Sequence, residues 1–423
     1  MKTIIVRNIN ATVDAVRPKP KEQHRKKVES IILDVQKRKD KALKEYEKKF
    51  SGAKLRSFRV TKSEIKDAYS KVTKEQIAAI KIAKKRLERT ESALKSQLQN
   101  ITIKIDGIKI TKVFVPLERV GCYIPGGGAR YPSTAMMSIV PAKIAGVKKI
   151  IAVSPPNKNG LIDPLTLVVA DLCGVDEFYK TGGAQAIAAL AYGTESVPKV
   201  DKIVGPGGSF VTLAKLIVNN TVSIDMIAGP TELAIIADSA AEADVVASDL
   251  ISQAEHSSET MCCLITTSTK LKDFVIKSVE QKIRKIQRRK IVMESLSTNG
   301  FVAICKTESD VIEFANKLAP EHLEIITKNP QRIAQKITSA GLVLIGKNTP
   351  SSASDYLLGS NHILPTSGFG RARGSLSVLD YMKIQSKIES SKMALQKISK
   401  YMKSITSAEG LPNHYEAVRI RLK

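Results

Sequence analysis

The chain has 423 residues, of which 43% are hydrophobic, and a formal net charge of +26 from 67 lysine and arginine residues against 41 aspartate and glutamate residues. This length is too great for one ordinary hydrophobic core and predicts two large units with smaller appendages. An apolar run of about 18 residues is absent, and Met1–Asn10 lacks a signal-peptide pattern, which excludes a membrane-spanning class and predicts a cytoplasmic protein.

The first hundred residues predict a short strand over Thr3–Val6 followed by long charged helices. Within this region Val28, Ile31 and Val35 recur at roughly helical spacing, with lysine and arginine residues between them. Such a helix buries one face and exposes its charges to solvent.

The positive charge raises the question of a nucleic-acid partner. Lysines are spread along the chain, aromatic residues make up only 4% of it, and no zinc-finger or recognition-helix signature occurs. We therefore expect no specific nucleic-acid binding, although nonspecific electrostatic attraction remains open.

From about residue 110, short β-rich runs alternate with glycine turns and helical patterns. The first series comprises KKIIAVSPP (148–156), a helix near Pro164–Leu172, EFYKTGG, AQAIAALAYG, DKIVGPGG and SFVTLAKLIV. The second series comprises ELAIIADS (232–239), TMCCLITT (260–267), GFVAIC (300–305), HLEIIT (322–327) and GLVLIG (341–346). Strand, turn and helix in regular succession are typical of βαβ units on a parallel sheet.

These patterns predict an α/β fold with two Rossmann-like parallel-sheet domains, a helical N-terminal region and a small helical C-terminal tail domain. The expected boundaries are an N-terminal extension at 1–19, a first Rossmann-like domain at 20–122 and 232–375, a second at 123–231, and the tail at 376–423. Because the tail is too small to fold alone, we expect it to pack on something else, such as a second subunit.

Four glycine-rich turns could bind an anion through backbone amides. They are PGGGAR (125–130), KTGGAQ (180–185), VGPGGSF (204–210) and GFGRARG (368–374). None matches the G-x-G-x-x-G dinucleotide fingerprint or a P-loop, so spacing alone favours tight turns of an α/β fold over a nucleotide site.

Cysteine usage argues against disulfides and sulfur-bound metal. The five cysteines are odd in number and mostly in apolar contexts, without C-x-x-C spacing: Cys122, Cys173, Cys262, Cys263 and Cys305. This pattern indicates buried thiols.

Four of the five histidines follow a carboxylate or an amide residue, in AEH (254–256), PEH (320–322), SNH (360–362) and PNH (412–414). Ser239 and Glu242 form a capping-box pattern that predicts a helix from Ala240, which would place Gln253 and His256 on one face.

A carboxylate elsewhere in the chain adds a third possible ligand. Asp355, in SASDYLLGSNH, has no lysine or arginine nearby in the sequence. Imidazole, carboxylate and carbonyl donors suit zinc or a similar divalent ion, although a single histidine is more often a structural residue.

A carboxyl and an imidazole group are adjacent at an expected element boundary. Thr307 and Asp310 mark the start of a helix that Pro320 ends, and a strand follows. Glu321 and His322 therefore lie where side chains can be both positioned and accessible, and their different pKa values suit general acid and base catalysis.

Five motifs follow one another along the chain: IDMIAGPTELAIIAD (224–238), ISQAEH, KLAPEHLEI, SDYLLGSNHILPT and AEGLPNH. Considered together, they resemble the histidinol dehydrogenase family, and the resemblance extends over nearly the whole chain. The resemblance implies NAD-dependent, four-electron oxidation of L-histidinol via L-histidinal to L-histidine, the last two steps of histidine biosynthesis. It also implies one Zn²⁺ per subunit and a homodimer with shared active sites.

The resemblance further implies a role for each matching residue. His322 would accept the alcohol proton and Glu321 would act as base in the hydration of the aldehyde. The implied zinc ligands are Gln253, His256, Asp355 and, from the tail of a second subunit, His414. The implied substrate contacts are Thr231, Gln253, His256, His322, Asp355, His362, Glu409 and His414. The implied NAD contacts are Tyr123, Gln185 and Gly208.

Two positions depart from the usual family pattern. Gly208 stands where the family usually has asparagine, and loss of one hydrogen bond predicts NAD binding weaker by about 0.5–1.5 kcal/mol. Thr231 stands where serine is common but keeps the hydroxyl group.

Three alternatives remain open from the sequence. The first is a related zinc- and NAD-dependent dehydrogenase of another small alcohol, such as a sulfopropanediol dehydrogenase. The second is a basic nucleic-acid-binding protein on an inactive scaffold, and the third is a zinc hydrolase that needs no NAD.

Overall fold

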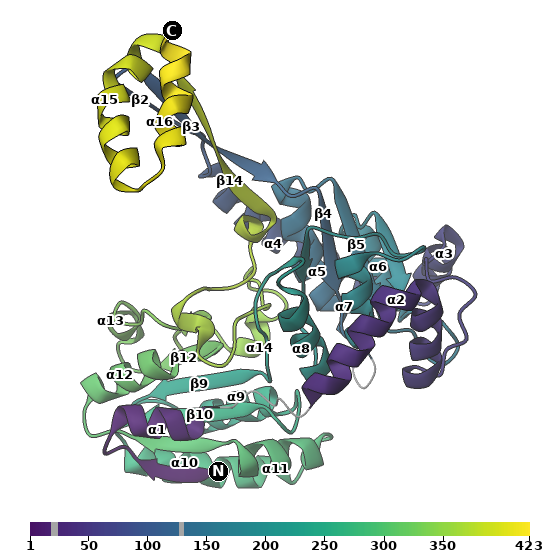
Figure 1. Ribbon diagram of the computed structural model, residues 1–423. Helices are drawn as coiled ribbons and strands as arrows, with labels where there is room; N and C mark the ends of the chain where they lie inside the picture. Colours follow the sequence, from purple (N-terminus) through teal and green to yellow (C-terminus); the bar gives the residue numbers. More distant parts are fainter. Residues whose placement is uncertain (18–23, 127–130) are drawn as a thin grey trace.

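The computed structural model describes residues 1–17, 24–126 and 131–423, which form two parallel sheets and one antiparallel ribbon (Figure 1). The larger sheet has six parallel strands in the order β1-β11-β10-β9-β12-β13. These strands are β1 (Lys2–Ile5), β11 (Phe301–Ile304), β10 (Met261–Thr266), β9 (Glu232–Ala237), β12 (His322–Ile326) and β13 (Leu342–Ile345). Strands β9 and β10 are buried at every residue, as expected for parallel strands covered on both faces.

Helices cover both faces of the six-stranded sheet. One face packs against α1 (Ile9–Val16), α12 (Glu308–Leu318) and α13 (Pro330–Ala334). The other packs against α9 (Ala243–Ala254), α10 (Thr269–Ile283) and α11 (Arg289–Thr298). The predicted boundaries of α12 are confirmed: Thr307 and Asp310 form a reciprocal capping box, and Ala319, in the left-handed conformation (φ 49°), ends the helix before Pro320.

The smaller sheet has five parallel strands in the order β6-β5-β4-β7-β8. These strands are β6 (Glu177–Lys180), β5 (Lys149–Ser154), β4 (Arg119–Tyr123), β7 (Lys202–Val204) and β8 (Ser223–Ile224). One face packs against α2 (Arg25–Phe50), α7 (Gly183–Tyr192) and α8 (Ser209–Val218). The other packs against α3 (Lys62–Tyr69), α4 (Lys74–Ser96), α5 (Pro132–Ala145) and α6 (Pro164–Leu172).

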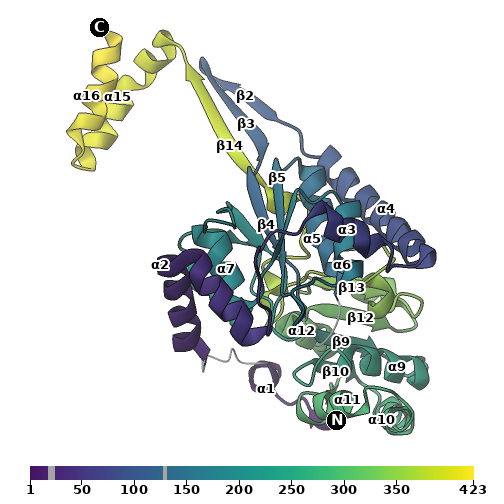
Figure 2. The same ribbon diagram turned by 90° about the vertical axis from the view of Figure 1, so that its right-hand side faces the viewer.

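An antiparallel ribbon leads away from the two sheets to the C-terminus (Figures 1 and 2). It consists of β2 (Ile101–Ile105), β3 (Ile108–Pro116) and β14 (Met382–Ser390), in the order β14-β3-β2. Beyond it lie α15 (Lys392–Ala408), α16 (Pro412–Arg419) and η4 (Ile420–Leu422). We call residues 101–116 and 382–423 the arm.

Between β13 and the arm, the chain forms α14 (Ser351–Ser354), η2 (Phe369–Arg371) and η3 (Val378–Tyr381). This segment contacts both sheet-containing bodies, because Asn361 Nδ2 donates to the Met137 carbonyl oxygen of α5 (2.8 Å) and Ser367 N–H donates to Glu232 Oε1 of β9 (2.8 Å).

The prediction of an α/β fold with two parallel sheets is confirmed, but the expected boundaries need correction. The expected extension at 1–19 contains β1, which pairs with β11, and the 19/20 boundary lies outside the described residues. Helices α2–α4, expected with the first domain, pack on the five-stranded sheet, and the division at 122/123 falls inside β4. The tail expected to be helical begins with η3 and the strand β14. These boundaries depend on pairing and packing between segments that lie far apart in the sequence. Local patterns of hydrophobic and polar residues do not predict such contacts.

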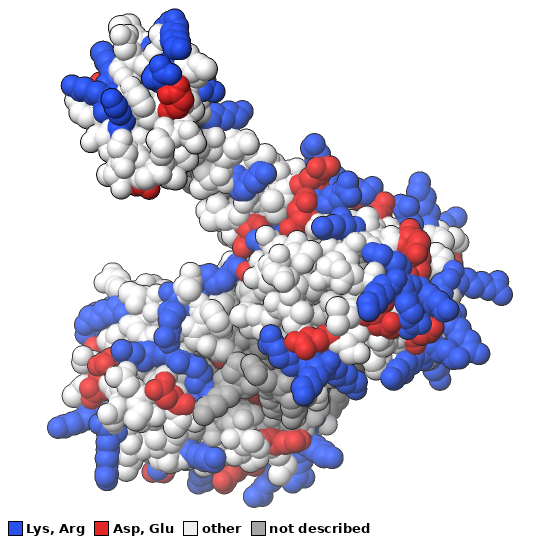
Figure 3. Space-filling model, in the orientation of Figure 1, with Lys and Arg blue, Asp and Glu red and all other residues white. Residues whose placement is uncertain are grey.

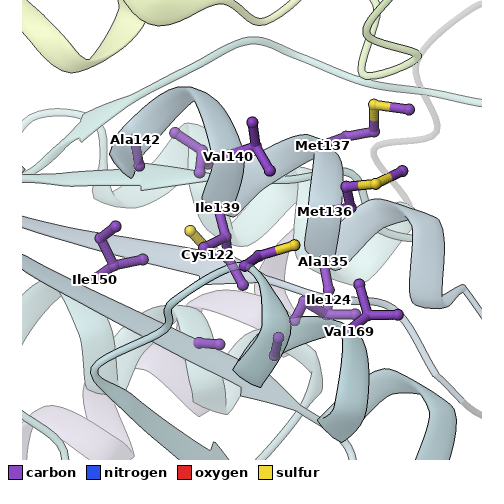
Figure 4. Close-up of a cluster of buried hydrophobic side chains, with 14 of the residues drawn as sticks. Cys122, Ile124, Ala135, Met136, Met137, Ile139, Val140, Ala142, Ile150 and Val169 are labelled. Atoms are coloured by element: carbon purple, nitrogen blue, oxygen red, sulfur yellow. The ribbon is translucent and has the colours of Figure 1, made fainter. Parts of the chain in front are cut away.

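The core and the surface agree with the composition. Figure 4 shows Ile139 and Val140 of α5 packed in a cluster with Cys122 and Ile150 of neighbouring strands. All five cysteines are buried and free, as predicted. On the face shown in Figure 3, lysine and arginine side chains are scattered over both bodies and the arm. No helix in the described part of the chain is long and apolar enough to cross a membrane.

Candidate active site

The candidate active site lies at the amino ends of β9 and β12. These strands pair in parallel with His322 opposite Leu233, so Glu232, Glu321 and His322 come together at one edge of the sheet. Helix α9 runs back from the far edge, and its last turn brings Gln253 to the same edge.

One detail of this arrangement differs from prediction. Helix α9 begins at Ala243, not Ala240, because Asp238 Oδ1 accepts a hydrogen bond from Ala240 N–H (3.0 Å) and holds a turn before the helix. Glu242 is the N-cap residue without a side-chain cap bond, so the predicted capping box is wrong. His256 follows the C-cap residue Glu255 and lies just beyond the helix that carries Gln253.

Asp355 is the centre of the site. Its Oδ1 lies 3.5 Å from His322 Nε2, and its Oδ2 lies 4.0 Å from His256 Nε2. Its backbone carbonyl oxygen lies 2.7 Å from His362 Nδ1. The structure thus brings together three histidines that lie far apart in the sequence, as expected for a functional site.

Glu321 and His322 contact each other and a third acidic residue, Glu232. Glu321 Oε2 lies 3.7 Å from His322 Nδ1 and accepts a hydrogen bond from Glu232 N–H (2.8 Å). Glu232 Oε2 accepts in return from Glu321 N–H (3.3 Å), and its Oε1 accepts from Ser367 N–H (2.8 Å). Sequence reasoning missed Glu232, because a carboxylate at the start of an apolar strand usually marks a solvent-exposed strand end.

The surroundings separate the proton affinities of these groups. Burial disfavours a charged His322, but the neighbouring carboxylates of Glu321 and Asp355 outweigh it and raise the pKa of His322 to about 10. Burial would raise the pKa of Asp355, yet its histidine neighbours hold that pKa below the usual value. Burial lowers the pKa of His362 and raises the pKa of Glu232 to about 8. Neighbouring groups with separated pKa values can transfer protons at a bound molecule.

The donors around Asp355 fit a metal ion, although the described residues contain no cluster of three or more histidine, cysteine or acidic side chains arranged for one. The candidate set depends on an amide, Gln253, whose Oε1 accepts from Ser351 Oγ (3.2 Å) while its Nε2 is buried without a partner. Because Ser351 can also accept a hydrogen bond, a half-turn of the amide would put the carbonyl oxygen at the unpartnered position. Two ligand atoms at ~2.1 Å from a tetrahedral zinc ion lie ~3.4 Å apart, so His256 Nε2 and Asp355 Oδ2, at 4.0 Å, would need to approach each other by only about 0.6 Å to share one ion.

The remaining implied substrate residues are divided between the site and the arm. Thr231 immediately precedes Glu232 and therefore lies beside the site. Glu409 is the C-cap residue of α15, and His414 is in α16, so both are in the arm, which projects away from the two sheets (Figures 1 and 2). Within one chain, the structure does not bring these two residues to Asp355.

The implied NAD contacts lie at the carboxyl edge of the five-stranded sheet, where α/β folds commonly bind ligands. Tyr123 ends β4, and its hydroxyl accepts a hydrogen bond from Gly183 N–H (3.1 Å) at the start of α7. Gln185 is buried in the first turn of α7, and Gly208 is the N-cap residue of α8. Gly205, in the same turn as Gly208, has φ 110°, and an added Cβ would lie 2.1 Å from the Tyr123 carbonyl oxygen, so only glycine fits there.

Two of the four glycine-rich turns, which their spacing predicted to be tight turns of an α/β fold, donate hydrogen bonds to the protein's own carboxylates. In the turn at 180–185, Glu47 Oε1 accepts hydrogen bonds from Thr181 Oγ1 (2.9 Å), Gly182 N–H (3.0 Å) and Gln185 Nε2 (2.9 Å). In the turn at 204–210, Gly205 N–H donates to Asp225 Oδ2 (2.7 Å). The turn at 125–130 lies mostly outside the described residues.

A cavity of about 320 Å³ lies elsewhere, at the opposite edge of the six-stranded sheet. It is lined by the loops that follow β9, β12 and β13, including Glu242, Lys328 and Lys347, and by none of the candidate site residues. The chemistry of the site therefore does not coincide with this cavity.

A buried carboxyl–imidazole pair beside a candidate metal set, in a chain with two parallel sheets, defines the class as an α/β enzyme. A model of the histidinol dehydrogenase family matches residues 16–422. The chain belongs to the histidinol dehydrogenase family, oxidoreductases of histidine biosynthesis.

Curated relatives and a solved structure agree with this assignment. The histidinol dehydrogenase of Clostridium acetobutylicum is 45% identical over 400 residues, covering 94% of this chain and 92% of the relative. That of Methanocaldococcus jannaschii is 44% identical over 396 residues, with the same coverage. A crystal structure of histidinol dehydrogenase from Elizabethkingia anophelis superposes with a TM-score of 0.93 at 37% identity, covering 100% of this chain and 98% of that chain.

Proposed function

We propose that this enzyme oxidises L-histidinol through L-histidinal to L-histidine with two molecules of NAD, and that it uses one Zn²⁺ per subunit. The observation that carries the proposal is the convergence of His256, His322 and His362 on Asp355, next to Glu321. General acid–base groups lie beside a set of nitrogen and oxygen donors, as substrate orientation and proton transfer require.

Gln253, His256 and Asp355 would hold the zinc ion, with His414 from a second subunit as the fourth protein ligand. When bound, zinc would supply a positively charged template that orients the amino and imidazole nitrogens of the substrate. His362 and Thr231, at the edge of this set, would contact the substrate together with Glu409 of the second subunit.

His322 would accept the alcohol proton as hydride leaves to NAD. The carboxylates of Glu321 and Asp355 hold a proton on the His322 ring. If Asp355 were shared with a cation, that hold would weaken and the pKa of the ring would be lower. Glu321, fixed by Glu232 N–H, would then accept a proton from the water that adds to the aldehyde.

Tyr123, Gln185 and the turn at Gly208 would contact NAD at the carboxyl edge of the five-stranded sheet. These three positions lie on or next to β4, α7 and α8, which pack around the same edge. The nicotinamide would then face the substrate from the body opposite the zinc ligands.

The test is NADH formation, followed by absorbance, with L-histidinol and NAD before chelation, after chelation and after zinc re-addition. We expect two NADH per histidinol, lost on chelation and restored by zinc. Absence of NADH from zinc-loaded protein at high NAD would overturn the proposal. A panel of other small alcohols tests the alternative substrates in the same assay.

We also propose that the enzyme is a homodimer in which the arm of each subunit completes the site of the other. The arm exposes large apolar side chains, which a monomer would leave in water. Those more than half exposed are Ile101, Ile384, Ile388, Met393, Tyr401, Ile405 and Ile420. His414 and Glu409 are in this same arm, away from their own chain's Asp355.

Subunit mixing tests this arrangement. Neither His322→Ala nor His414→Ala homodimers should be active, but a mixed dimer should regain activity at the site that combines an intact His322 with an intact His414. Recovery requires sites built from two chains, and no recovery after verified subunit exchange would contradict sharing.

A further inference from the structure

Ser351, the first residue of α14, contacts both candidate metal ligands that are not histidines. Its hydroxyl Oγ lies 3.2 Å from Gln253 Oε1, and its carbonyl oxygen accepts a hydrogen bond from Asp355 N–H (3.0 Å). The residue is only 1% exposed, so both contacts are buried.

Ser351 is itself fixed by the neighbouring strand. Its N–H donates to Glu324 Oε1 of β12 (2.6 Å), and its carbonyl oxygen also accepts from Ser354 Oγ (2.7 Å). Strand β12 also carries His322, two residues before Glu324. The contact therefore connects α14, and with it Asp355, to the strand that provides the catalytic imidazole.

The Gln253 amide has two ends that differ in chemistry, and only its oxygen can bind a cation. With Oε1 facing Ser351, its Nε2 is a buried donor without a partner, which disfavours that orientation of the amide. A serine hydroxyl can donate to Oε1 or accept from Nε2. With Nε2 donating to Ser351 Oγ, the oxygen takes the unpartnered position and is available as a ligand.

We propose that Ser351 is a positioning residue for the metal ion: its hydroxyl accepts from Gln253 Nε2 and so holds the amide with its oxygen toward a bound metal, while its backbone holds Asp355. The inference rests on the proposed zinc set. Side chains that orient metal ligands typically contribute 10–100-fold to metal affinity, and their loss is felt without any change in the ligands themselves.

The experiment measures zinc affinity of the full-length protein by competition with a chromogenic chelator. We expect Ser351→Ala to weaken zinc binding about 10–100-fold. The matched control is Ser295→Ala in α11. This change removes a buried hydroxyl that donates to the Thr260 carbonyl oxygen (2.9 Å), just before β10, and that has no hydrogen bond to a candidate ligand. The control should bind zinc as the wild type does, and unchanged affinity in Ser351→Ala would overturn the proposal.

A glutamate at position 253 tests whether Ser351 affects zinc affinity through the orientation of the Gln253 amide. A carboxylate presents oxygen at both ends, so Gln253→Glu needs no orientation. Adding Ser351→Ala to Gln253→Glu should change zinc affinity by less than about threefold, whereas the same change beside Gln253 should cost about 10–100-fold. Equal losses in both backgrounds would assign the effect to general packing and overturn the proposal.

Two more variants test whether the hydroxyl group is what matters at position 351 and whether Gln253 belongs to the proposed set of zinc ligands. Ser351→Thr keeps the hydroxyl and should retain zinc affinity, while equal losses in the alanine and threonine variants would contradict the proposal. Gln253→Ala tests whether Gln253 is a ligand at all. If Gln253→Ala leaves zinc affinity unchanged, the proposed metal set is wrong; if it weakens binding and Ser351→Ala does not, only the positioning role is wrong.

Discussion

At the scale of single residues, Gly208 offers a gain-of-function test of NAD binding. An added Cβ would meet no atom within 4 Å, and the backbone has ordinary angles (φ −65°, ψ 177°), so a side chain fits without strain. Gly208→Asn should restore one hydrogen bond to NAD, worth about 0.5–1.5 kcal/mol, and so tighten NAD binding about 2–12-fold. The measurement is calorimetric titration with NAD, supported by the KM for NAD.

Gly208→Ala is the matched control, because it adds a Cβ without a hydrogen-bonding group. It should bind NAD as the wild type does. If the asparagine and alanine variants bind NAD equally, position 208 does not contact the dinucleotide.

The same scale shows where prediction from sequence reached its limit in the site. Asp355, Glu321 and the three histidines were identified because polar residues in recognisable motifs are conspicuous. Glu232, Glu47 and Ser351 were missed, because each begins to matter only when a partner far away in the sequence is placed beside it. Glu47, for example, reads as one charge among many in a basic helix, yet it is fully buried.

At the scale of elements, Glu47 holds α2 to the start of α7. Its Oε1 accepts from Thr181, Gly182 and Gln185, and Ser51 Oγ donates to its Oε2 (2.8 Å). Glu47→Ala would leave several buried donors unpaired, at about 1–3 kcal/mol each, so the free energy of unfolding should fall by roughly 3 kcal/mol or more. Urea denaturation measures this loss, and a rise in the KM for NAD should accompany it because Gln185 loses its partner.

Glu45, on the same helix, provides the comparison. It is exposed and pairs with Arg38 (2.8 Å). Glu45→Ala should change the free energy of unfolding by less than ~1 kcal/mol, as for other exposed ion pairs. If the two substitutions lowered the free energy of unfolding equally, the buried Glu47 carboxylate would contribute no more to stability than the exposed Glu45 carboxylate.

The contact between β12 and α9 predicts a pH dependence of stability. Burial, together with the neighbouring Asp249 carboxylate, raises the pKa of Glu324 from its usual 4.5 to about 8. Between these values the folded protein keeps a proton that the unfolded chain releases. The free energy of unfolding should therefore fall as pH rises from about 4.5 to 8, by at most ~1.4 kcal/mol per pH unit for this group.

Glu324→Gln should reduce this slope, because its amide can accept from Ser351 N–H and donate to Asp249 without titrating. Urea unfolding at several pH values between 5 and 8 would measure it in both proteins. An unchanged slope in the variant would assign the pH dependence to other groups.

Elements were predicted best where the pattern is local. The runs at 148–156, 232–239, 260–267 and 322–327 each contain an observed strand, because continuous apolar segments between glycine turns have few alternatives in an α/β fold. The ribbon strand β14 was not predicted, because its partner β3 lies far earlier in the chain and both of its faces are largely exposed. Helix α9 was predicted with the wrong start because the Asp238 turn competes with helix initiation.

At the scale of the whole molecule, the arm is the feature on which the proposed homodimer depends. Met393, Tyr401 and Ile405 lie on one stripe of α15, spaced by multiples of four residues, and are 67%, 60% and 58% exposed. An exposed apolar stripe of this kind is typical of a surface that binds another protein surface. In the proposed homodimer, a second copy of the chain would cover this stripe and bring His414 to Asp355.

A charge placed on this stripe should separate the subunits. Tyr401→Glu and Ile405→Glu would each bury a charge in the interface, and a central interface residue contributes about 2 kcal/mol or more, equivalent to ~30-fold weaker dimerisation. Sedimentation velocity should show a shift from dimer to monomer, and activity should fall at the concentrations where the dimer dissociates, because His414 and Glu409 no longer reach a partner's Asp355. Phe274→Glu, at a comparably exposed position (52%) on α10, is the control and should stay dimeric and active. A Tyr401→Glu protein that is monomeric yet fully active would show that each chain builds its own site and would contradict the shared arrangement.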